Sequence, residues 1–325
     1  DFFFTNRRLR RRGEQPEEEP SQREAPPAPT PIAEAGAEEA EEETGSDISI
    51  GANITVTDGH LSILGSDSIA QKANITVSAA SKSIDIEAVD SVTMAAGTTL
   101  QSNAGHIRIK AGSGDVTLET ITVANLSAGD IAVIAGNDIK DINADSLIIA
   151  DALLLEAGSG IGSSANVLNT KVNTLSASAG SGGMFITEQN GITIGNASST
   201  VMRVDSTALD SNLTNTSSTQ EDLSTTSAGA IMLTVTAGDM SVNGGSNSSA
   251  LSAAGSGNVR LDAQAGAMAV NAALDAGSGH ITLLASTTFS QAADGDISTT
   301  TGDVDIESGS SATMADGAQS TTTDG

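Results

Sequence analysis

Two pairs of acidic residues have the spacing at which carboxylates can act together on a sugar bond. Asp85 and Glu87 lie two positions apart in the segment SIDIEA, and Asp305 and Glu307 repeat that spacing in DVDIES. On a β-strand the two carboxylates of a pair point the same way, roughly 6.5–7 Å apart, which suits the acid and base of a glycoside hydrolase. Alternation of core-facing and water-facing positions explains both pairs equally well. We expect no catalytic residue here, because no nearby arginine, lysine cluster or aromatic platform could bind and orient a sugar.

Three histidines are the next candidates, as ligands of a metal ion. His60, His106 and His280 each follow a glycine and precede an apolar alternation, and Ser83 holds the equivalent place between the first two. His60 and His106 would therefore lie two coils apart, about 10 Å from each other, whereas both ring nitrogens must lie about 2.1 Å from a shared zinc ion. We expect polar turn residues that are interchangeable with Asp or Asn, and no zinc site.

Aspartates at turn positions form the one set that suits a hard cation. Asp115 and Asp138 fall at equivalent places one predicted coil apart, and Asp141 follows closely. Stacked carboxylate oxygens of this kind can bind Ca²⁺. The glycine-rich nonapeptide with which some repeat proteins bind calcium is missing. Diffuse attraction of counterions to an acidic surface is the preferred explanation, with these three residues as candidate calcium ligands and no other cofactor expected.

A short recurring motif positions all of these residues: a glycine, then Asp, His or Asn, then two apolar residues that flank a polar one. Such alternation has a period of two and is typical of strands with one face in a core and the other in water. It places Arg108, Lys110 and Glu119 on the water side. The motif occurs as GHLSI at 59, GHIRI at 105, GDVTL at 114, GDIAV at 129, GDMSV at 238, GNVRL at 257, GHITL at 279 and GDVDI at 302.

The distance between successive strands selects the architecture. Ile84, Ile107, Ile131 and Leu153 follow one another at intervals of 23, 24 and 22 residues, with two further strands in each interval. Three short strands per coil of about 23 residues are typical of a parallel β-helix, whose strands pair with their equivalents one coil away. A β-sandwich does not require so constant an interval, and helical repeats need apolar spacings of three and four. We predict an all-β solenoid of about a dozen coils, roughly 55 Å long at ~4.8 Å per coil.

Composition divides the chain into four segments. All six prolines lie within the first 31 residues, and proline is excluded from interior strands because it lacks an N–H. Residues 1–46 are Arg-rich and then rich in Pro, Ala and Glu, which is typical of a disordered leader or linker. We predict coils over 47–204 and 230–325. The Ser/Thr/Asn-rich residues 205–229 are expected to form an insertion or irregular coil, either flexible or a binding surface.

A longer period is superimposed on the coils. Residues 83–105 match residues 303–325 at a constant offset of 220, and the match reaches back to GHLSIL at 59, which corresponds to GHITLL at 279. We expect one full copy of a large repeat and the start of a second, cut from a longer array. The opening DFFFTNRRLRRRG, which has no initiator Met, agrees with a fragment or a processed form.

Bulk composition excludes several function classes. The 41 acidic and 14 basic residues give a net charge of −27, which opposes binding to the phosphate backbone of nucleic acids. Cysteine is absent, which excludes disulfides, zinc–thiolate sites and thiol catalysis. With five Phe and no Tyr or Trp, stacking platforms for bases or sugar rings are missing. No apolar run approaches the 18 or more residues of a membrane span.

Several longer phrases resemble a known family. They are similar to segments of the filamentous-haemagglutinin-like, very large repetitive surface proteins of bacteria, including those grouped under the LEPR-XLL name, and the resemblance covers residue 47 to the end. It implies a right-handed parallel β-helix, export to the medium or to a cell surface associated with the outer membrane, and adhesion or matrix building. The phrases are GSGDVTLE at 112, GDIAVIAGNDIKD at 129, LLLEAGSGIGSSANVLNTKVNTLSASAGSGGMFITEQNGITIG at 153 and GSGHITLLA at 277.

The expected function is that of a structural or adhesive repeat segment, a stalk or passenger, of a large exported bacterial surface protein without catalytic activity. The expected partners are a host or neighbouring-cell surface, a matrix glycan or protein, and neighbouring repeats of the same chain, but no nucleic acid. The alternative is a β-helix protein that binds or degrades polysaccharide with its surface carboxylates.

Overall fold

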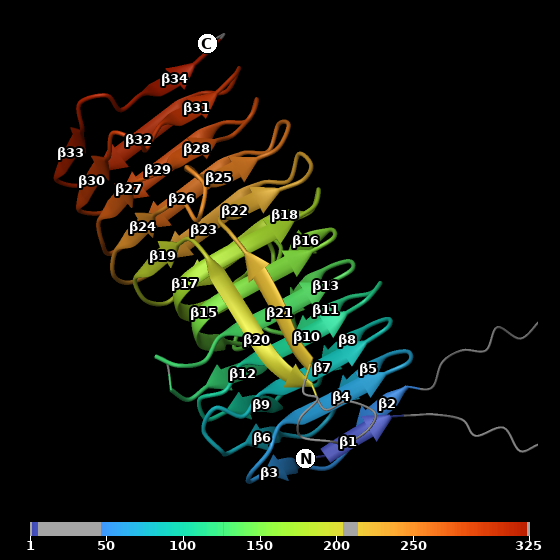
Figure 1. The fold of residues 1–325 in the computed structure, drawn as a ribbon. Coiled ribbons are helices and arrows are strands. Elements are labelled where there is room, and N and C mark those ends of the chain that lie inside the picture. Colours follow the sequence, from blue (N-terminus) through green and yellow to red (C-terminus); the bar gives the residue numbers. More distant parts are fainter. Residues whose placement is uncertain (1, 6–46, 126, 204–213, 324–325) are drawn as a thin grey trace, which may run out of the picture.

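The computed structural model describes residues 2–5, 47–125, 127–203 and 214–323, and over these residues the chain is a rod of stacked coils (Figure 1). Every regular element within the described residues is a β-strand. The disordered leader predicted over residues 1–46 lies outside the described residues, apart from the four-residue strand β1.

The strands stack as a β-solenoid of about 11 turns of about 23 residues, which confirms the predicted fold class. The turns contribute to three parallel ladders, and β15, β17 and β18 each pair in two of them. Ladder three is offset at β19, which pairs with Thr174 and Leu175 of β17. Ladder one contains β1 (Phe2–Thr5), β4 (Leu61–Gly65), β7 (Ile84–Ala88), β10 (Ile107–Ala111), β13 (Ile131–Ala135), β15 (Ile148–Ala157), β17 (Leu168–Ala179), β22 (Leu223–Thr225), β25 (Ser249–Ala253), β28 (Ala273–Asp275), β31 (Ile297–Thr299) and β34 (Ser320–Thr322). Ladder two contains β2 (Ile48–Ile50), β5 (Ile69–Gln71), β8 (Val92–Met94), β11 (Val116–Leu118), β14 (Ile139–Asp141), β16 (Gly160–Ile161), β18 (Gly183–Glu188), β23 (Ile231–Val235), β26 (Val259–Ala263), β29 (Ile281–Ala285) and β32 (Val304–Ser308). Ladder three contains β3 (Ile54–Val56), β6 (Ile75–Val77), β9 (Thr99–Ser102), β12 (Thr120–Val123), β19 (Ile192–Ile194), β24 (Met240–Val242), β27 (Met268–Val270), β30 (Thr288–Gln291) and β33 (Ser311–Met314).

The apolar alternation of the sequence becomes a single continuous core. Ile84, Ile107, Ile131 and Leu153 pair in register on β7, β10, β13 and β15, and each is fully buried. Burial of one such side chain stabilises the fold by about 1.5–3 kcal/mol relative to leaving it exposed. The 23-residue interval in the sequence is therefore the distance along the chain between stacked core residues.

The turns bring successive coils so close that glycine is required. A Cβ atom at Gly105 would lie 2.0 Å from the carbonyl oxygen of Lys82 on the preceding coil. Gly183 has a φ of 73°, a conformation that L side chains rarely adopt, and a Cβ there would lie 2.4 Å from the carbonyl oxygen of Ala230. These glycines allow the close backbone approach that keeps the ladders paired through the corners.

The polar residue after the glycine accepts a hydrogen bond from the backbone of the next coil. Asn258 Oδ1 accepts a hydrogen bond from the backbone N–H of His280 at 2.9 Å, and Asp115 Oδ1 accepts one from the N–H of Asp138 at 3.1 Å. Because the backbone N–H at this corner is bonded by the side chain of the preceding coil, this position favours side chains with an acceptor atom. Asp, Asn and His all supply one, which accounts for their exchange within the motif.

One element leaves the solenoid. β20 (Ala197–Arg203) and β21 (Thr214–Gln220) form an antiparallel hairpin inserted between β19 and β22. The hairpin lies across the outside of ladder one and contacts β15, β13, β10 and β7 (Figure 1). The sequence predicts an insertion over 205–229, whereas the structure begins it at Ala197 and returns to ladder one at Leu223. Residues 204–213 lie outside the described residues.

The 220-residue period is visible in the local structure. β4 and β7 correspond to β29 and β32, with the same strand bounds and the same pairing register. The buried Gln71 donates a hydrogen bond to the carbonyl of Thr99 at 3.1 Å, and the buried Gln291 donates one to the carbonyl of Gln319, 220 residues later, at 2.7 Å. The two copies occupy different ladders, because β7 belongs to ladder one and β32 to ladder two. Their matching faces are therefore not in line along the rod.

Candidate functional site

A row of outward-facing residues on ladder one is buried, although outward positions on a solenoid normally meet water. Strand pairing places them one above another in register. None is more than 3 % exposed, and the hairpin contacts β7, β10, β13, β15 and β17 on this face. We call these residues the covered row: Ser62, Asp85, Arg108, Ala132, Leu154 and Ser176.

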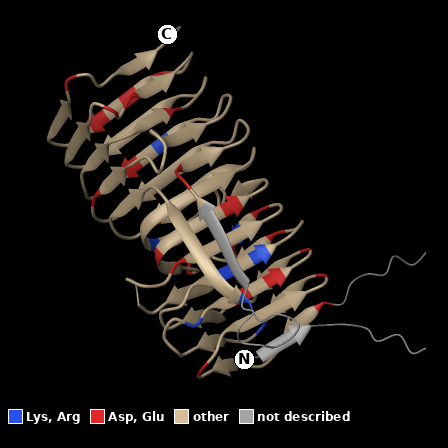
Figure 2. Ribbon diagram, viewed as in Figure 1, with Lys and Arg blue, Asp and Glu red and all other residues tan. Residues whose placement is uncertain are grey.

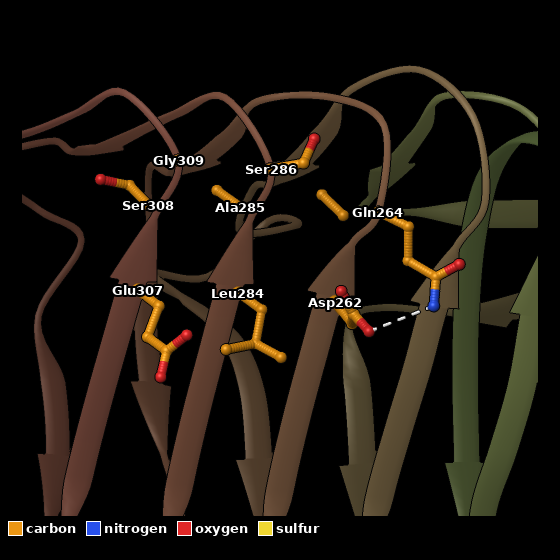
Figure 3. Close-up of a pocket in the computed structure, with 9 residues that line it drawn as sticks. Asp262, Gln264, Leu284, Ala285, Ser286, Glu307, Ser308 and Gly309 are labelled. Atoms are coloured by element: carbon orange, nitrogen blue, oxygen red, sulfur yellow. Dashed lines mark hydrogen bonds between the residues drawn. The ribbon is translucent and has the colours of Figure 1, made fainter.

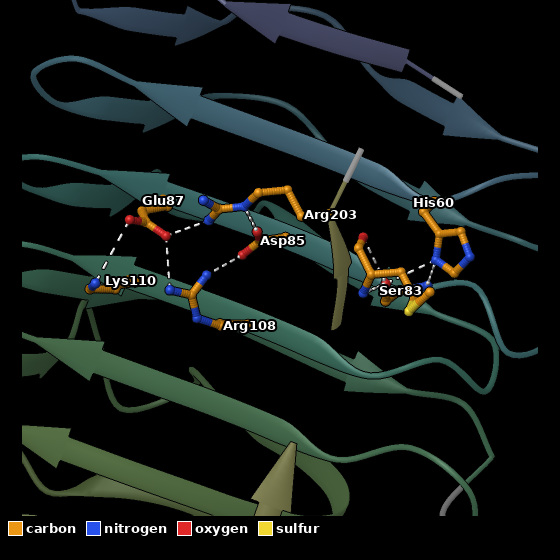
Figure 4. Close-up of polar contacts among 8 residues, drawn as sticks. His60, Ser83, Asp85, Glu87, Arg108, Lys110 and Arg203 are labelled. Carbon is orange, nitrogen blue, oxygen red and sulfur yellow. Dashed lines mark hydrogen bonds and ion pairs between the residues drawn. The ribbon is translucent and has the colours of Figure 1, made fainter. Parts of the chain in front are cut away.

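One end of the covered row is a compact cluster of ion pairs. Arg108, from the neighbouring strand β10, donates to Asp85 at 2.6 Å and to Glu87 at 2.8 Å. Arg203, at the end of β20, donates through Nε to Asp85 at 2.8 Å and through a second nitrogen to Glu87. The side chain of Lys110 lies 3.7 Å from Glu87. Figure 4 shows both guanidinium groups directed at the same pair of carboxylates.

The arginines determine the protonation of Glu87. Burial raises the pKa of its carboxyl, but hydrogen bonds from Arg203 and Arg108, together with their positive charges, outweigh burial and lower the pKa from 4.5 to about 2. A carboxyl with so low a pKa holds no proton at neutral pH and cannot act as a general acid. Asp85 has no exposed surface, so a substrate has no access to it.

Two expectations about this region are wrong. The carboxylates Asp85 and Glu87 do have arginines beside them, one from the next coil and one from the hairpin. Arg108 does not face water, since it is 3 % exposed. Arg203 is a member of this cluster that the sequence did not predict. The sequence offers one indication of its role: Arg203 is a basic residue next to a Ser/Thr-rich segment in a chain with a net charge of −27.

The middle of the covered row is apolar. Ala132 and Leu154 pack against Ala197 of β20 in a small cluster outside the main core. Val201 of β20 is also fully buried, while Ser198 between them is exposed. The hairpin therefore alternates between a face on the solenoid and a face in water, and it holds ladder one by apolar contact at one end and by ion pairs at the other.

The histidines lie at turns, one beside the hairpin. His60 Nδ1 accepts a hydrogen bond from the backbone N–H of Ser83 at 3.0 Å, and Ser83 Oγ accepts one from the N–H of Met202 at 2.8 Å (Figure 4). His106 accepts from the N–H of Asp130 at 3.1 Å, and His280 does the same for the next coil. The structure does not bring the three rings together.

The candidate calcium ligands do not form one site. Asp115 and Asp138 do lie on successive coils, but the ammonium of Lys140 lies between them, 2.5 Å from Asp115 and 3.3 Å from Asp138. Burial raises the pKa of the Asp115 carboxyl. The hydrogen bonds from Lys140 and from its other donors outweigh burial, so the pKa is lowered overall. Asp141 is buried on the inward side of β14, next to Asn169. Within the described residues, no group of three or more acidic or histidine side chains could hold a metal ion.

Two buried glutamates were also missed. Glu188, at the end of β18, is fully buried, and its carboxylate accepts hydrogen bonds from Thr170 at 2.7 Å and from the backbone of Gln189 at 2.8 Å. Burial raises the pKa of the Glu188 carboxyl, and it outweighs these hydrogen bonds, which lower the pKa. Glu119, expected in water, is 6 % exposed and bonded by Asn143 at 2.9 Å. The signal for Glu188 was a carboxylate at an apolar position of the alternation. Both glutamates accept hydrogen bonds from residues at the corners between strands.

The second copy of the repeat carries the same carboxylates without a cover. Asp305 and Glu307 on β32 are exposed, and within the described residues no ion pair joins either of them to a basic side chain. A shallow pocket of about 360 Å³ lies beside them over β26, β29 and β32 (Figure 3). We call it the open groove; its polar and larger lining residues are Asp262, Gln264, Leu284, Ser286, Glu307 and Ser308.

Charge is unevenly divided over the rod. Figure 2 shows acidic positions along its whole length and few basic ones.

Among the described residues, no helix is long and apolar enough to cross a membrane. Comparison with family models, with curated proteins and with solved structures finds no match.

Proposed function

We propose that this chain is a structural repeat segment that acts as a rigid spacer in a large exported surface protein of the adhesive type. The observation that supports this most is the hairpin, which ties the coils of β15, β13, β10 and β7 together on the outside of the solenoid. A solenoid whose coils contact only their neighbours bends and frays locally. A strand that spans several coils opposes such motion.

The enzymatic alternative has less support. Its best candidates, Asp85 and Glu87, are both hydrogen-bonded to Arg108 and Arg203, and the hairpin covers the first of them. Their chemistry is that of a structural ion-pair network. The exposed pair in the second copy has no aromatic side chain among the residues that line the open groove.

The spacer role predicts a fixed distance along the rod. The chain has no cysteine, so spin labels can be attached through Ser49→Cys and Thr321→Cys, both at exposed positions near opposite ends of the solenoid. About ten coils at ~4.8 Å separate them, or roughly 50 Å. A single narrow distance distribution in pulsed electron resonance would support the proposal, and a broad one would refute a rigid spacer.

The enzymatic alternative is tested separately. The chain is incubated with a panel of acidic and neutral polysaccharides, and the products are measured by reducing-end formation. We expect no cleavage. Reproducible cleavage that disappears in the Asp85→Asn, Glu87→Gln double variant or in the Asp305→Asn, Glu307→Gln double variant would overturn the structural role.

A further inference from the structure

A buried corner between ladder two and ladder three contains two carboxylates without a basic partner. Glu119 directly follows β11, and Asp141 ends β14 one coil later; each is 6 % exposed. Among the ion pairs of the described residues, none joins either carboxylate to a lysine, an arginine or a histidine. A buried carboxylate is costly unless a positive charge or hydrogen bonds compensate it. The corner therefore lacks a positive charge that its two acids require.

One carboxylate oxygen in this corner has no hydrogen-bond partner. Asn169 Nδ2 donates to Asp141 Oδ2 at 3.2 Å, whereas Asp141 Oδ1 is buried and has none. Five other buried side-chain atoms in the described part of the chain also lack a partner, but Asp141 Oδ1 is the one carboxylate oxygen among them. A buried polar atom without a partner in a native fold marks a position for a bound ion or a water molecule.

The two carboxylates lie around one hydroxyl group. Ser146 Oγ is 3.4 Å from Glu119 Oε2. Burial raises the pKa of the Asp141 carboxyl, and a hydrogen bond from Ser146 is the first of the contacts that oppose burial. A hydroxyl has a single proton and donates fully to one carboxylate only. A cation bound to Asp141 is therefore also attracted by the charge of Glu119.

Loops of the same coil and of the next coil surround Asp141 with oxygen-bearing groups. Asn166 Nδ2 donates to the backbone carbonyl of Asp141 at 2.7 Å, and Asn169 Nδ2 donates to the backbone carbonyl of Ala144 at 3.3 Å. Carboxylates, asparagine amides and backbone carbonyls are the oxygen ligands of Ca²⁺, which takes about six to eight of them. None of these groups contains the sulfur or imidazole that softer metal ions select. Their chemistry therefore favours Ca²⁺.

We propose that the corner around Asp141 is a binding site for one calcium ion. Asp141 Oδ1 is the anchoring ligand, and Glu119 supplies the second negative charge. Oxygen atoms of residues 143–146 and 166–169 are the source of the remaining ligands. Two carboxylates neutralise one divalent cation, whereas a water molecule leaves both charges in place. The site goes beyond the spacer role, which requires no bound ion and stands if the site fails.

The probe is calcium chloride, titrated by isothermal calorimetry into the full chain after treatment with a chelator, in sodium chloride with excess Mg²⁺. We expect one saturable site that weakens at least tenfold in Asp141→Asn and in Glu119→Gln. The matched control is Asp115→Asn, which removes one carboxylate at a turn where Lys140 is already its partner, and it should bind calcium within twofold of the parent. Heat no greater than the buffer blank overturns the proposal. Equal weakening in Asp141→Asn and Asp115→Asn also overturns it, since the attraction would then be that of a diffuse acidic surface.

Urea unfolding separates loss of the ligand from loss of the fold. Asp141→Asn keeps the shape of the side chain and removes a buried charge, so with chelator present it should be at least as stable as the parent. Saturating calcium should raise the unfolding midpoint of the parent and not that of Asp141→Asn, because only a ligand of the folded state shifts the equilibrium. Glu119→Gln repeats this test at the second carboxylate if Asp141→Asn does not fold. A parent midpoint that calcium does not change would rule out the site.

Discussion

The face of β7 and the face of β32 carry the same sequence pattern in opposite states. On β7 the carboxylates are tied to two arginines beneath a hairpin, and on β32 they are exposed beside a shallow groove. The strand itself, with its inward isoleucine and outward acids, is the same in both. The strand pattern alone therefore does not decide whether an outward position is core or surface; on β7 the neighbouring strand β10 and the hairpin together bury Asp85.

The largest expected effect is at Asp85. Asp85→Ala leaves the guanidinium of Arg108 buried without its closest partner, and breaking a buried ion pair in this way costs about 3–5 kcal/mol. The repeat supplies the control, because Asp305→Ala removes an exposed side chain and should change stability by less than about 0.5 kcal/mol. Urea unfolding of both variants measures the difference. Equal effects would contradict the assignment of one covered and one open face.

The next effect concerns the apolar end of the hairpin. Leu154 is an outward residue of β15 at 1 % exposure, and Leu154→Ala should cost about 2–4 kcal/mol because it leaves a cavity under Ala197. Leu284→Ala, at a partly exposed outward position of β29, should cost under about 1 kcal/mol, since the site borders the open groove. Thermal unfolding compares the two. A cost for Leu284→Ala as large as that for Leu154→Ala would show that the open face is covered in solution.

The third effect concerns how stability depends on pH at the two faces. The pKa of Glu87 is about 2 in the folded chain against 4.5 ordinarily, so its stabilisation is complete above about pH 4.5 and is lost as the pH falls toward 2. Glu87→Gln should reduce stability at pH 7 and flatten this part of the profile. Glu307→Gln is the comparison that removes one negative charge without arginine contacts. Unfolding measured from pH 2 to 7 tests this, and a parallel profile for Glu87→Gln would contradict it.

The smallest effect is expected at an exposed ion pair. Lys140, whose side chain is 46 % exposed, bridges Asp115 and Asp138 at a turn. Such a pair is worth about 0–1 kcal/mol, so Lys140→Gln should change the free energy of unfolding by less than about 1 kcal/mol. A loss comparable to that of Asp85→Ala would show that turn charges, and not the covered cluster, stabilise the coils.

The coil architecture could be predicted from the sequence because every coil repeats the same physical requirement. The inward residues Ile84, Ile107 and Ile131 recur at one coil length, and the turn residues recur with an acceptor atom. Period and register follow from local alternation. The 220-residue match was also readable, because it is a direct identity of sequence.

The covered cluster could not be predicted in the same way. Arg203 is 118 residues from Asp85 along the chain and hydrogen-bonds to it. The apolar alternation does not indicate that a Ser/Thr-rich insertion folds back over earlier coils. Alternation also assigns every outward residue to water, so it placed Arg108 and Glu119 wrongly. Arg108 is buried where the hairpin, a distant segment, contacts β10, whereas Glu119 is buried at a corner where Asn143 of the next coil bonds to it. A single sequence carries only indirect signs of such contacts, here the scarcity of basic residues and the position of one of them.

The most direct test of the account is whether the hairpin lies on β7. In the cysteine-free chain, Ser83→Cys with Met202→Cys places two thiols where Ser83 Oγ and the backbone nitrogen of Met202 are 2.8 Å apart. Asp303→Cys with Met202→Cys is the matched control, because Asp303 is the repeat counterpart of Ser83. Mild oxidation should give an intramolecular disulfide in the first variant and none in the second. A first variant that stays reduced, or that forms only cross-linked dimers, would contradict the account.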